Sequence, residues 1–161
     1  MDCNTTNYGC NGGDKGLAFK YAETNMMELE SSYPYTAMDG SCKYNAGLGV
    51  LNVTDYTYVT VENIDALKSA IDGRPVSVSI QANEPVFQLY TSGVITSTSC
   101  GQVHNHAVLA AGYGVENGTP YYWVKNSWGT GWGDNGYVKI GMADGIGICA
   151  VQSAPIWPTT D

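Results

Sequence analysis

One histidine and one asparagine are the side chains that could act together on a substrate. His106 lies at the head of the apolar run HAVLAAGYG, and Asn126 lies within the Gly- and Trp-rich stretch YWVKNSWGTGWGDNGY. An imidazole can take a proton from a neighbouring group, and an amide oxygen beside the ring can hold its tautomer and angle without competing as a base. Both side chains must therefore be positioned by the elements that carry them.

Those elements are predicted by periodicity and by turn residues. Residues 1–13 read as a Gly-rich loop, 14–25 as a helix capped by Asp14, 31–45 as loop and 61–73 as a second helix. The apolar faces would be formed by Leu17, Ala18, Tyr21 and Ala22 in the first helix, and by Ile64, Leu67 and Ile71 in the second.

The second half of the chain changes character to short β-branched and aromatic runs separated by Gly, Asn and Pro. These predicted strands cover 75–81, 106–114, 121–128 and 136–142. Helices first and strands later indicate an α+β fold with an antiparallel barrel or sandwich. Residues two apart on a strand face the same side, so Asn126 and Trp128 can both face His106.

Composition limits the class of protein. The 161 residues suggest one domain or most of one, and 43% hydrophobic with 14% charged residues allows a packed core. A net charge of -8 argues against a binder of nucleic-acid phosphates, which needs a basic face. No apolar run approaches the ~20 residues of a membrane span.

The cysteines indicate disulfides rather than a metal site. There are five cysteines, with no CxxC pair, and the two histidines are only two positions apart. Zinc sites use tighter paired spacing, so we expect neither a metal nor a cofactor. Disulfides imply an oxidising compartment, and sequons at Asn4, Asn52 and Asn117 are consistent with a secretory route. An odd cysteine remains to be explained.

Six segments in register resemble one known family. They are DCNTTNYGCNGGDKGLAFKYAETN, SYPYTAMDGSCKYN, PVSVSIQA, FQLYTSGVI, HAVLAAGYG and KNSWGTGWGDNGYVKI. In this order they resemble the papain-like cysteine peptidases, closest to the cathepsin L branch, from about residue 2 to the end. The resemblance implies a two-lobed α+β fold, with about 1–60 forming the rest of the helical lobe and the crossover and about 61–161 mainly the antiparallel β-barrel lobe.

The resemblance also implies an activity, the hydrolysis of peptide bonds by a thiolate–imidazolium pair. His106 would be the catalytic imidazole, Asn126 the group that orients it, and Trp128 the ring that covers their hydrogen bond. The residues alone favour a plainer interpretation, in which His106 is a hydrogen-bonded strand-edge residue and Asn-Ser-Trp-Gly is a turn.

The same resemblance implies the residues that bind an extended peptide. Gly12 and Gly13 would offer bare backbone to the substrate, and the carbonyl of Asn105 would accept a hydrogen bond beside the scissile bond. His104 has a plainer alternative, a hydrogen bond within a loop. The main specificity pocket, with an unusually polar wall, would be lined by Asp14, Lys15, Ser79, His104, Ala107 and Ala154.

The family's nucleophile motif, C-G-S-C-W, occurs nowhere in these residues. By resemblance Cys3 pairs with Cys42 and Cys100 with Cys149, which leaves Cys10 as an unpaired thiol whose partner lies in an absent segment. We expect Cys10 to be structural and not the nucleophile. Met1 stands before DC and reads as the start of a truncated frame.

Two functional hypotheses remain open. In the first, the chain is the C-terminal part of a lysosomal, vacuolar or secreted cysteine endopeptidase acting on peptides or proteins. In the second, it is a non-catalytic peptide-binding or interaction module. Either way, uncovered apolar surface would favour self-association or a partner chain that supplies the missing segment.

Overall fold

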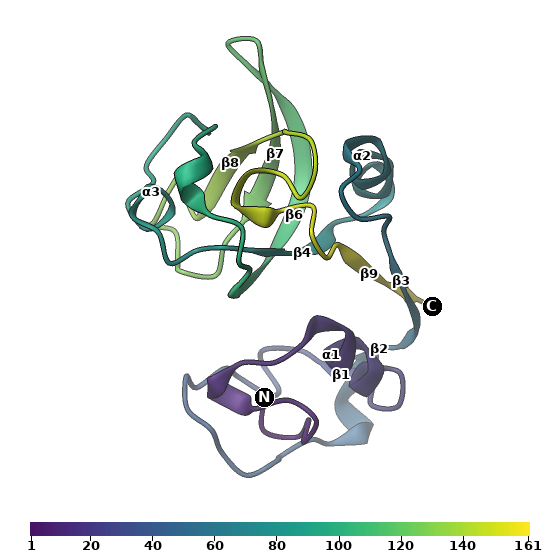
Figure 1. Cartoon of the computed structure of the whole chain (residues 1–161). Coiled ribbons are helices and arrows are strands. Elements are labelled where there is room, and N and C mark those ends of the chain that lie inside the picture. Colours follow the sequence, from purple (N-terminus) through teal and green to yellow (C-terminus); the bar gives the residue numbers. More distant parts are fainter. The chain divides into compact units, whose positions relative to one another are not determined.

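The computed structural model describes all 161 residues, and they form two compact units. Unit 1 comprises residues 1–57 together with 158–161, and unit 2 comprises 58–157. Figure 1 labels the elements of both units.

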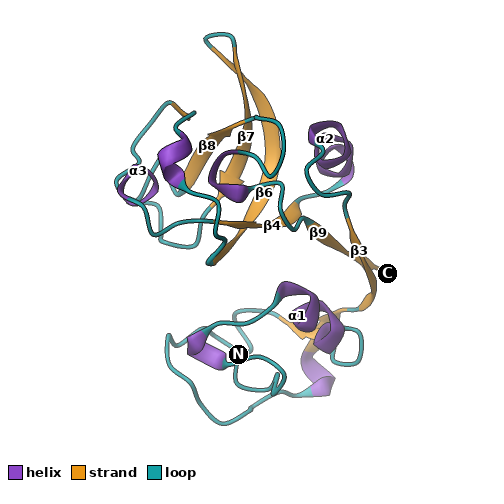
Figure 2. Cartoon of the chain, in the orientation of Figure 1, coloured by secondary structure: helices purple, strands orange, loops and turns teal.

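Unit 1 is built mostly from loops, drawn in teal in Figure 2. Its elements are the short 3-10 helices Gly9–Asn11 and Ala46–Leu48, helix α1 (Lys15–Ala22), and strands β1 (Met27–Glu28), β2 (Gly49–Leu51) and most of β3 (Val53–Tyr58). The loop predicted at 31–45 is present. Only Gly16, Ala22 and Val53 are buried in this unit, so its hydrophobic core is small.

Helix α1 begins as predicted, because the Asp14 side chain accepts a hydrogen bond from the Leu17 N–H at 3.0 Å. Its predicted apolar face is confirmed only in part. Ala22 is buried and Tyr21 half-buried, but Leu17 and Ala18 are exposed, and the ring of Phe19 lies 6.3 Å from that of Tyr56 in β3. Gly16 is buried as well, although periodicity scored by hydrophobicity does not favour a glycine.

Unit 2 contains most strands of one large sheet, together with helices. Its elements are α2 (Ile64–Gly73), β4 (Val76–Ile80), α3 (Pro85–Gln88), β5 (Val94–Ile95), the 3-10 turn Thr98–Cys100, β6 (His106–Glu116), β7 (Thr119–Lys125), β8 (Tyr137–Gly141), the 3-10 turn Ile148–Ala150 and the first residues of β9 (Ile156–Thr160). The seven-stranded sheet has the order β3-β9-β4-β6-β7-β8-β5. Neighbours β4–β6, β6–β7 and β7–β8 are antiparallel, and β5 pairs with β8 in parallel.

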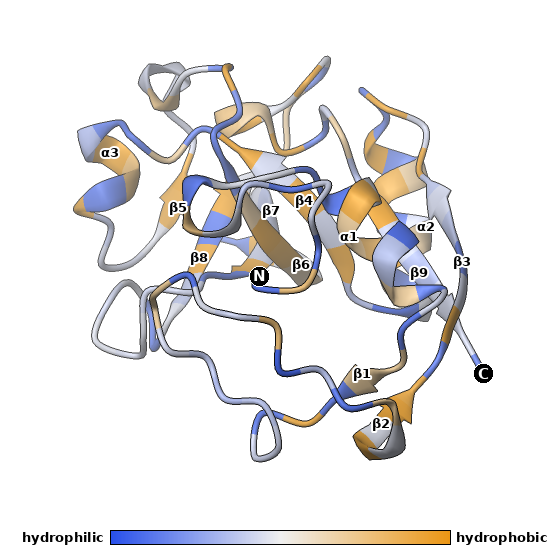
Figure 3. Cartoon of the chain, turned by 90° about the horizontal axis from the view of Figure 1, so that it is seen from below, coloured by the Kyte–Doolittle hydropathy of each residue, from blue (hydrophilic) through white to orange (hydrophobic).

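Buried and half-buried residues alternate along β4, so one face of the sheet forms part of the hydrophobic core. Val76, Val78 and Ile80 are fully buried, while Ser77 and Ser79 between them are only half-buried. Helix α2 adds the buried Leu67 and Ile71, and Figure 3 shows the mixture of hydrophobic and hydrophilic residues along it. The predicted α+β class and the strands of the second half are therefore confirmed.

Candidate active site

The backbone around His106 is held by its neighbour in sequence. The β4–β6 register places His106 opposite Ile80, and the Asn105 N–H donates to the Ile80 carbonyl at 2.8 Å. The Asn105 side chain accepts from the Ala82 N–H at 2.9 Å and donates to Asn83 Oδ1 at 2.8 Å. Three hydrogen bonds therefore tie the start of β6 to the end of β4, while the Asn105 carbonyl oxygen accepts none.

His106 and Asn126 are in direct contact, although they are 20 residues apart. His106 Nε2 lies 2.8 Å from Asn126 Oδ1, and that oxygen also accepts the backbone N–H of Ser127 at 2.8 Å. Because a backbone N–H can only donate, the Asn126 atom must be the oxygen and His106 Nε2 must carry the proton. In the neutral ring Nδ1 is then a free acceptor, ready to take a proton.

Asn126 reaches this position from a turn rather than from a strand. Strand β7 ends at Lys125, and the Asn126 N–H donates to the Gly136 carbonyl at 2.9 Å. Gly136 has φ +88, a conformation that favours glycine, so the return of the chain at this point depends on it. Asn126 and Trp128 both contact His106, as predicted, but the strand alternation used for that prediction does not apply after residue 125.

An aromatic cluster covers the imidazole. The ring of Trp128 stacks on that of His106 with centroids 5.3 Å apart, and Phe87 and Trp132 contact Trp128 edge-on at 5.5 and 5.2 Å. Trp132 is anchored in turn, since its Nε1 donates to the Gln88 carbonyl at 2.9 Å. The cluster screens one face of the His106 ring from water.

Sequence reasoning missed two members of this cluster. Trp132 lies within the Gly/Trp stretch that drew attention to Asn126, so its spacing of four from Trp128 was a usable signal. Phe87 comes from the short helix α3 and had no such signal, because its contact with Trp128 spans 41 positions of the chain.

The candidate specificity residues of unit 2 lie on β4, on β6 and in the loops before β6 and β9. Ser79 lies directly opposite Ala107 in the β4–β6 ladder, and Ala154 follows Ser153 in the loop before β9. His104 Nδ1 lies 3.3 Å from Ser153 Oγ. The loop hydrogen bond that was the plainer interpretation of His104 is therefore present.

The remaining candidate residues, Gly12 to Lys15, belong to unit 1. Gly12 has φ +99, and its carbonyl accepts the Tyr8 N–H at 2.9 Å. Gly13 is exposed, its backbone makes no hydrogen bond, and a side chain there would collide with Asn7. Burial lowers the pKa of Lys15 from 10.5 to about 8.

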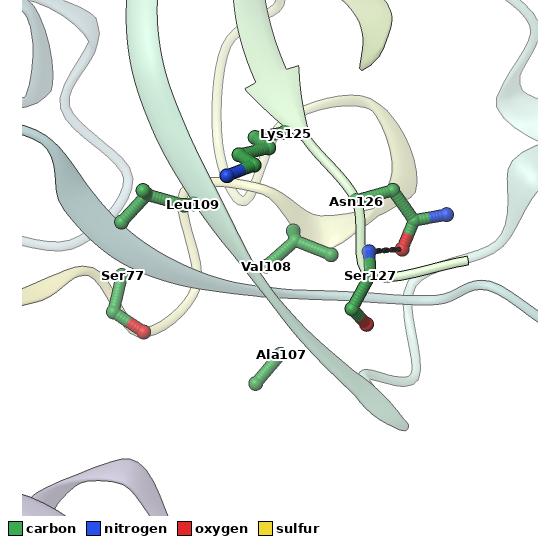
Figure 4. A pocket seen from close by; sticks show the side chains of 7 residues that line it. All are labelled: Ser77, Ala107, Val108, Leu109, Lys125, Asn126 and Ser127. Carbon is green, nitrogen blue, oxygen red and sulfur yellow. Dashed lines mark hydrogen bonds between the residues drawn. The ribbon is translucent and has the colours of Figure 1, made fainter. Parts of the chain in front are cut away.

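A cavity of about 310 Å³ opens on the sheet face beside Asn126. Figure 4 shows its lining, which comes from β4, β6 and the end of β7. Most of the lining is apolar or small, and Lys125 adds one exposed cation. The lining residues are Ser77, Ala107, Val108, Leu109, Lys125, Asn126 and Ser127.

Four of the five cysteines form the two disulfides that the resemblance implied, Cys3–Cys42 and Cys100–Cys149. Cys10 is free and exposed. Desolvation raises the pKa of its thiol, and hydrogen bonding and charge from Asp39 raise it further. A nucleophilic thiol needs the opposite shift, so the surroundings of Cys10 disfavour its thiolate.

The structure contains neither a cluster of metal-binding side chains nor a membrane-spanning helix. No group of three or more His, Cys, Asp or Glu side chains is arranged to hold a metal ion. None of the helices has the length and apolar character needed to cross a membrane.

The chain combines a two-unit α+β fold with an imidazole that an amide orients and an indole ring covers. This combination defines the class, that of the thiol proteases. The papain family cysteine protease model matches residues 1–159, and the chain belongs to that family. It is 45% identical to pro-cathepsin H of Medicago truncatula over 157 residues and 43% identical to a cathepsin L-like proteinase of Fasciola hepatica over 162.

These matches cover nearly the whole chain but only part of each relative. They span 94% of this chain and 44% of the Medicago protein, and 97% of this chain and 49% of the Fasciola protein. Among solved structures, the bromelain protease of Ananas comosus in complex with E64 is 37% identical, with a TM-score of 0.91. That alignment covers 98% of this chain and 74% of the bromelain chain.

Proposed function

We propose that these residues provide the imidazole half of a papain-type cysteine endopeptidase, with His106 as proton acceptor and donor. The observation that supports this most directly is the contact of His106 Nε2 with Asn126 Oδ1 at 2.8 Å, in which the Ser127 N–H orients the amide. This arrangement leaves His106 Nδ1 as the atom that exchanges protons. The nucleophile is contributed from outside these 161 residues.

The proposed reaction follows from that free nitrogen. His106 Nδ1 takes the proton of the thiol, and the imidazolium stabilises the thiolate, which attacks the peptide carbonyl carbon. The protonated ring then gives its proton to the leaving amine, and water hydrolyses the resulting thioester. Asn126 keeps the ring at one angle through both transfers and, unlike a carboxylate, does not compete for the proton.

We further propose how the substrate is bound. Gly13 supplies a free N–H and carbonyl, to which an extended peptide can add as a strand adds to a sheet edge. The short side chain of Ala107 leaves room for a substrate side chain, whereas His104 contacts Ser153. The expected substrates are therefore peptides or proteins.

The test joins the chain to a segment that carries the nucleophile. The 161 residues alone should show no turnover of a fluorogenic peptide, and Cys10→Ser should not change that result. Fused after the nucleophile-bearing N-terminal part of bromelain, the chain should gain activity that a thiol-alkylating epoxide abolishes. Removing one member of such a catalytic set commonly costs roughly 10³-fold or more, so His106→Ala should abolish the gain.

The matched control is His104→Ala, which removes the other histidine without touching the Asn126 contact. It should keep most of the gained activity. A fusion that folds and reacts with the epoxide, yet loses nothing on His106→Ala, would refute the assignment of His106.

A second candidate function, a non-catalytic peptide-binding module, is favoured by one observation, the unpaired backbone of Gly13. It predicts that the 161 residues alone bind extended peptides. Calorimetric titration with an unhydrolysed peptide measures that binding, and a peptide N-methylated along its backbone, which cannot donate to the Gly13 carbonyl, should bind more weakly.

We also propose a partner and a location. The cavity beside Asn126, with apolar walls and Lys125, suits an apolar segment that carries a carboxylate, supplied by a longer chain or by a second copy. Two disulfides are typical of a secreted, vacuolar or lysosomal protein, because these compartments preserve them.

A further inference from the structure

Three Asn-x-Thr sequons occur in the sequence, at Asn4, Asn52 and Asn117. A glycan on such an asparagine is bulky and must project into solvent from the folded surface. The three asparagines differ sharply in what their side-chain nitrogens already do. From these differences we propose that Asn117 is an N-glycan acceptor and that Asn4 and Asn52 are structural asparagines.

Asn117 and Gly118 form the two-residue turn between β6 and β7, with φ +50 and +81. Both residues are exposed, and the turn stands at the top of Figure 1, away from the other loops of unit 2. The Asn117 side chain makes no hydrogen bond, and a Cβ added at Gly118 would meet no atom within 4 Å. The flanking pair Glu116 and Thr119 closes the ladder, so the turn holds its shape without the amide.

The side chain of Asn52 is already engaged. Its Nδ2 donates to Asp161 Oδ2 at 2.9 Å, and the following residue, Val53, is 3% exposed. The sequon hydroxyl of Thr54 donates to the Thr159 carbonyl at 3.4 Å. A sugar on this nitrogen would have to be accommodated beside strands β3 and β9.

Asn4 is engaged at both ends of its amide. Nδ2 donates to the Leu17 carbonyl in α1 at 3.1 Å. Oδ1 accepts from the N–H of Thr6 at 3.0 Å and from its hydroxyl at 2.6 Å. The amide thereby ties the N-terminal loop to α1, next to the Cys3–Cys42 disulfide. A sugar attached to Nδ2 would interfere with the hydrogen bond to the Leu17 carbonyl.

The transfer requires a lipid-pyrophosphate-linked oligosaccharide as donor. Asn117 Nδ2 forms a bond to the anomeric carbon, the bond from that carbon to the pyrophosphate oxygen breaks, and the lipid pyrophosphate leaves with the bonding electrons. One Nδ2 proton is lost to the medium, and nothing is oxidised or reduced. The product amide keeps one N–H.

The experiment directs the chain into the secretory pathway of a eukaryotic cell. Soluble protein with both disulfides is treated with peptide N-glycosidase in heavy-oxygen water, and each converted asparagine is located by mass spectrometry. We expect the label at Asn117 in the glycosidase-treated sample and not in an untreated sample kept in the same water, with loss of the glycan in Thr119→Val and retention in Thr119→Ser. In Asn4→Gln and in Asn52→Gln, the mass that the glycan adds to the protein should be the same as in the unmodified chain. Soluble protein that is unmodified at Asn117, or equally modified at all three sites, would overturn the proposal.

A second measurement does not depend on secretion. In a Cys10→Ser background, Asn117→Cys and Asn52→Cys are each alkylated with an iodoacetamide derivative of N-acetylglucosamine. The sugar at position 117 should leave the urea midpoint unchanged, and the sugar at position 52 should lower it. An equal fall at both positions would contradict the distinction drawn between the two sites.

Discussion

At the scale of single residues, the amide of Asn126 acts on His106 through its oxygen alone. Asn126 is 7% exposed, and its Nδ2 has no hydrogen-bond partner. It is the only buried side-chain nitrogen or oxygen without one. An unpaired buried donor is unfavourable by roughly 1–3 kcal/mol. This unfavourable contribution falls on the residue that orients the imidazole of His106.

The first prediction concerns the tautomer of His106. The neutral ring should carry its proton on Nε2, and Asn126→Ala should release it into a mixture of tautomers, because Oδ1 no longer selects one form. Nitrogen chemical shifts of the imidazole rings report the tautomer, and the chain has only two histidines. His104→Ala identifies the His106 signals without disturbing them. An Nδ1-protonated ring in the unmodified chain would contradict the prediction.

Lys15 carries the second prediction. Burial lowers the pKa of its folded form to about 8, below the ordinary 10.5, so the folded state loses this proton first as pH rises. Between these two values the unfolded state binds more protons, and the free energy of unfolding must rise with pH. Relative to Lys15→Met, the unmodified chain should gain stability from neutral pH to about pH 9.5.

Urea unfolding followed by circular dichroism measures that difference at both pH values. Lys15→Met keeps an apolar stem and removes the titrating amine, so it serves as the reference. If the two proteins respond identically to pH, the lowered pKa of Lys15 is wrong.

At the scale of elements, α2 is the helix that closes the core of unit 2. Its first turn is capped by Asn63, whose side chain accepts the Ala66 N–H at 2.8 Å. Leu67, on the next turn, is fully buried. The cap therefore lies directly before the residue that anchors the helix in the core.

We predict that Asn63→Ala lowers the free energy of unfolding of unit 2 by about 1 kcal/mol, because the Ala66 N–H loses its acceptor. Asn63→Asp keeps an acceptor oxygen and should retain most of the stability. Tryptophan fluorescence in urea measures both variants. An equal loss in the Ala and Asp variants would show that the hydrogen bond is not the cause.

At the scale of the whole molecule, the two units differ in what holds them together. The connected hydrophobic core, from Val59 to Val151, lies within unit 2. Unit 1 buries three residues and relies on the Cys3–Cys42 disulfide, which closes a loop of 39 positions. A cross-link that closes a loop of this length raises the free energy of unfolding by about 4 kcal/mol in the chain-entropy model.

Unit 1 should therefore open before unit 2. All four tryptophans lie in unit 2, so their emission reports that unit alone, whereas amide exchange reports both. Amides of unit 1 should exchange at lower urea than the tryptophan transition. Replacing Cys3 and Cys42 by Ala should widen that gap, and replacing Cys100 and Cys149 should lower the tryptophan transition itself. A single transition seen by both probes in every variant would contradict this order.

Much of the fold follows from local sequence. The cap at Asp14, the alternation of β4 and the strands around His106 and Lys125 depend on neighbours within a few positions, so periodicity identified them. The buried face of α1 was predicted only in part, because Gly16 is selected by the space available rather than by hydrophobicity.

The sequence by itself determined the family, the elements and the pairing of His106 with Asn126, since six segments in order carry that information. Only the tertiary structure decided which amide atom faces the ring, that Phe87 supports Trp128, and which sequon asparagine is unengaged. Each of these depends on atoms brought together from distant parts of the chain or on a turn after β7. Their arrangement is set by packing and hydrogen-bond geometry, which no local pattern encodes.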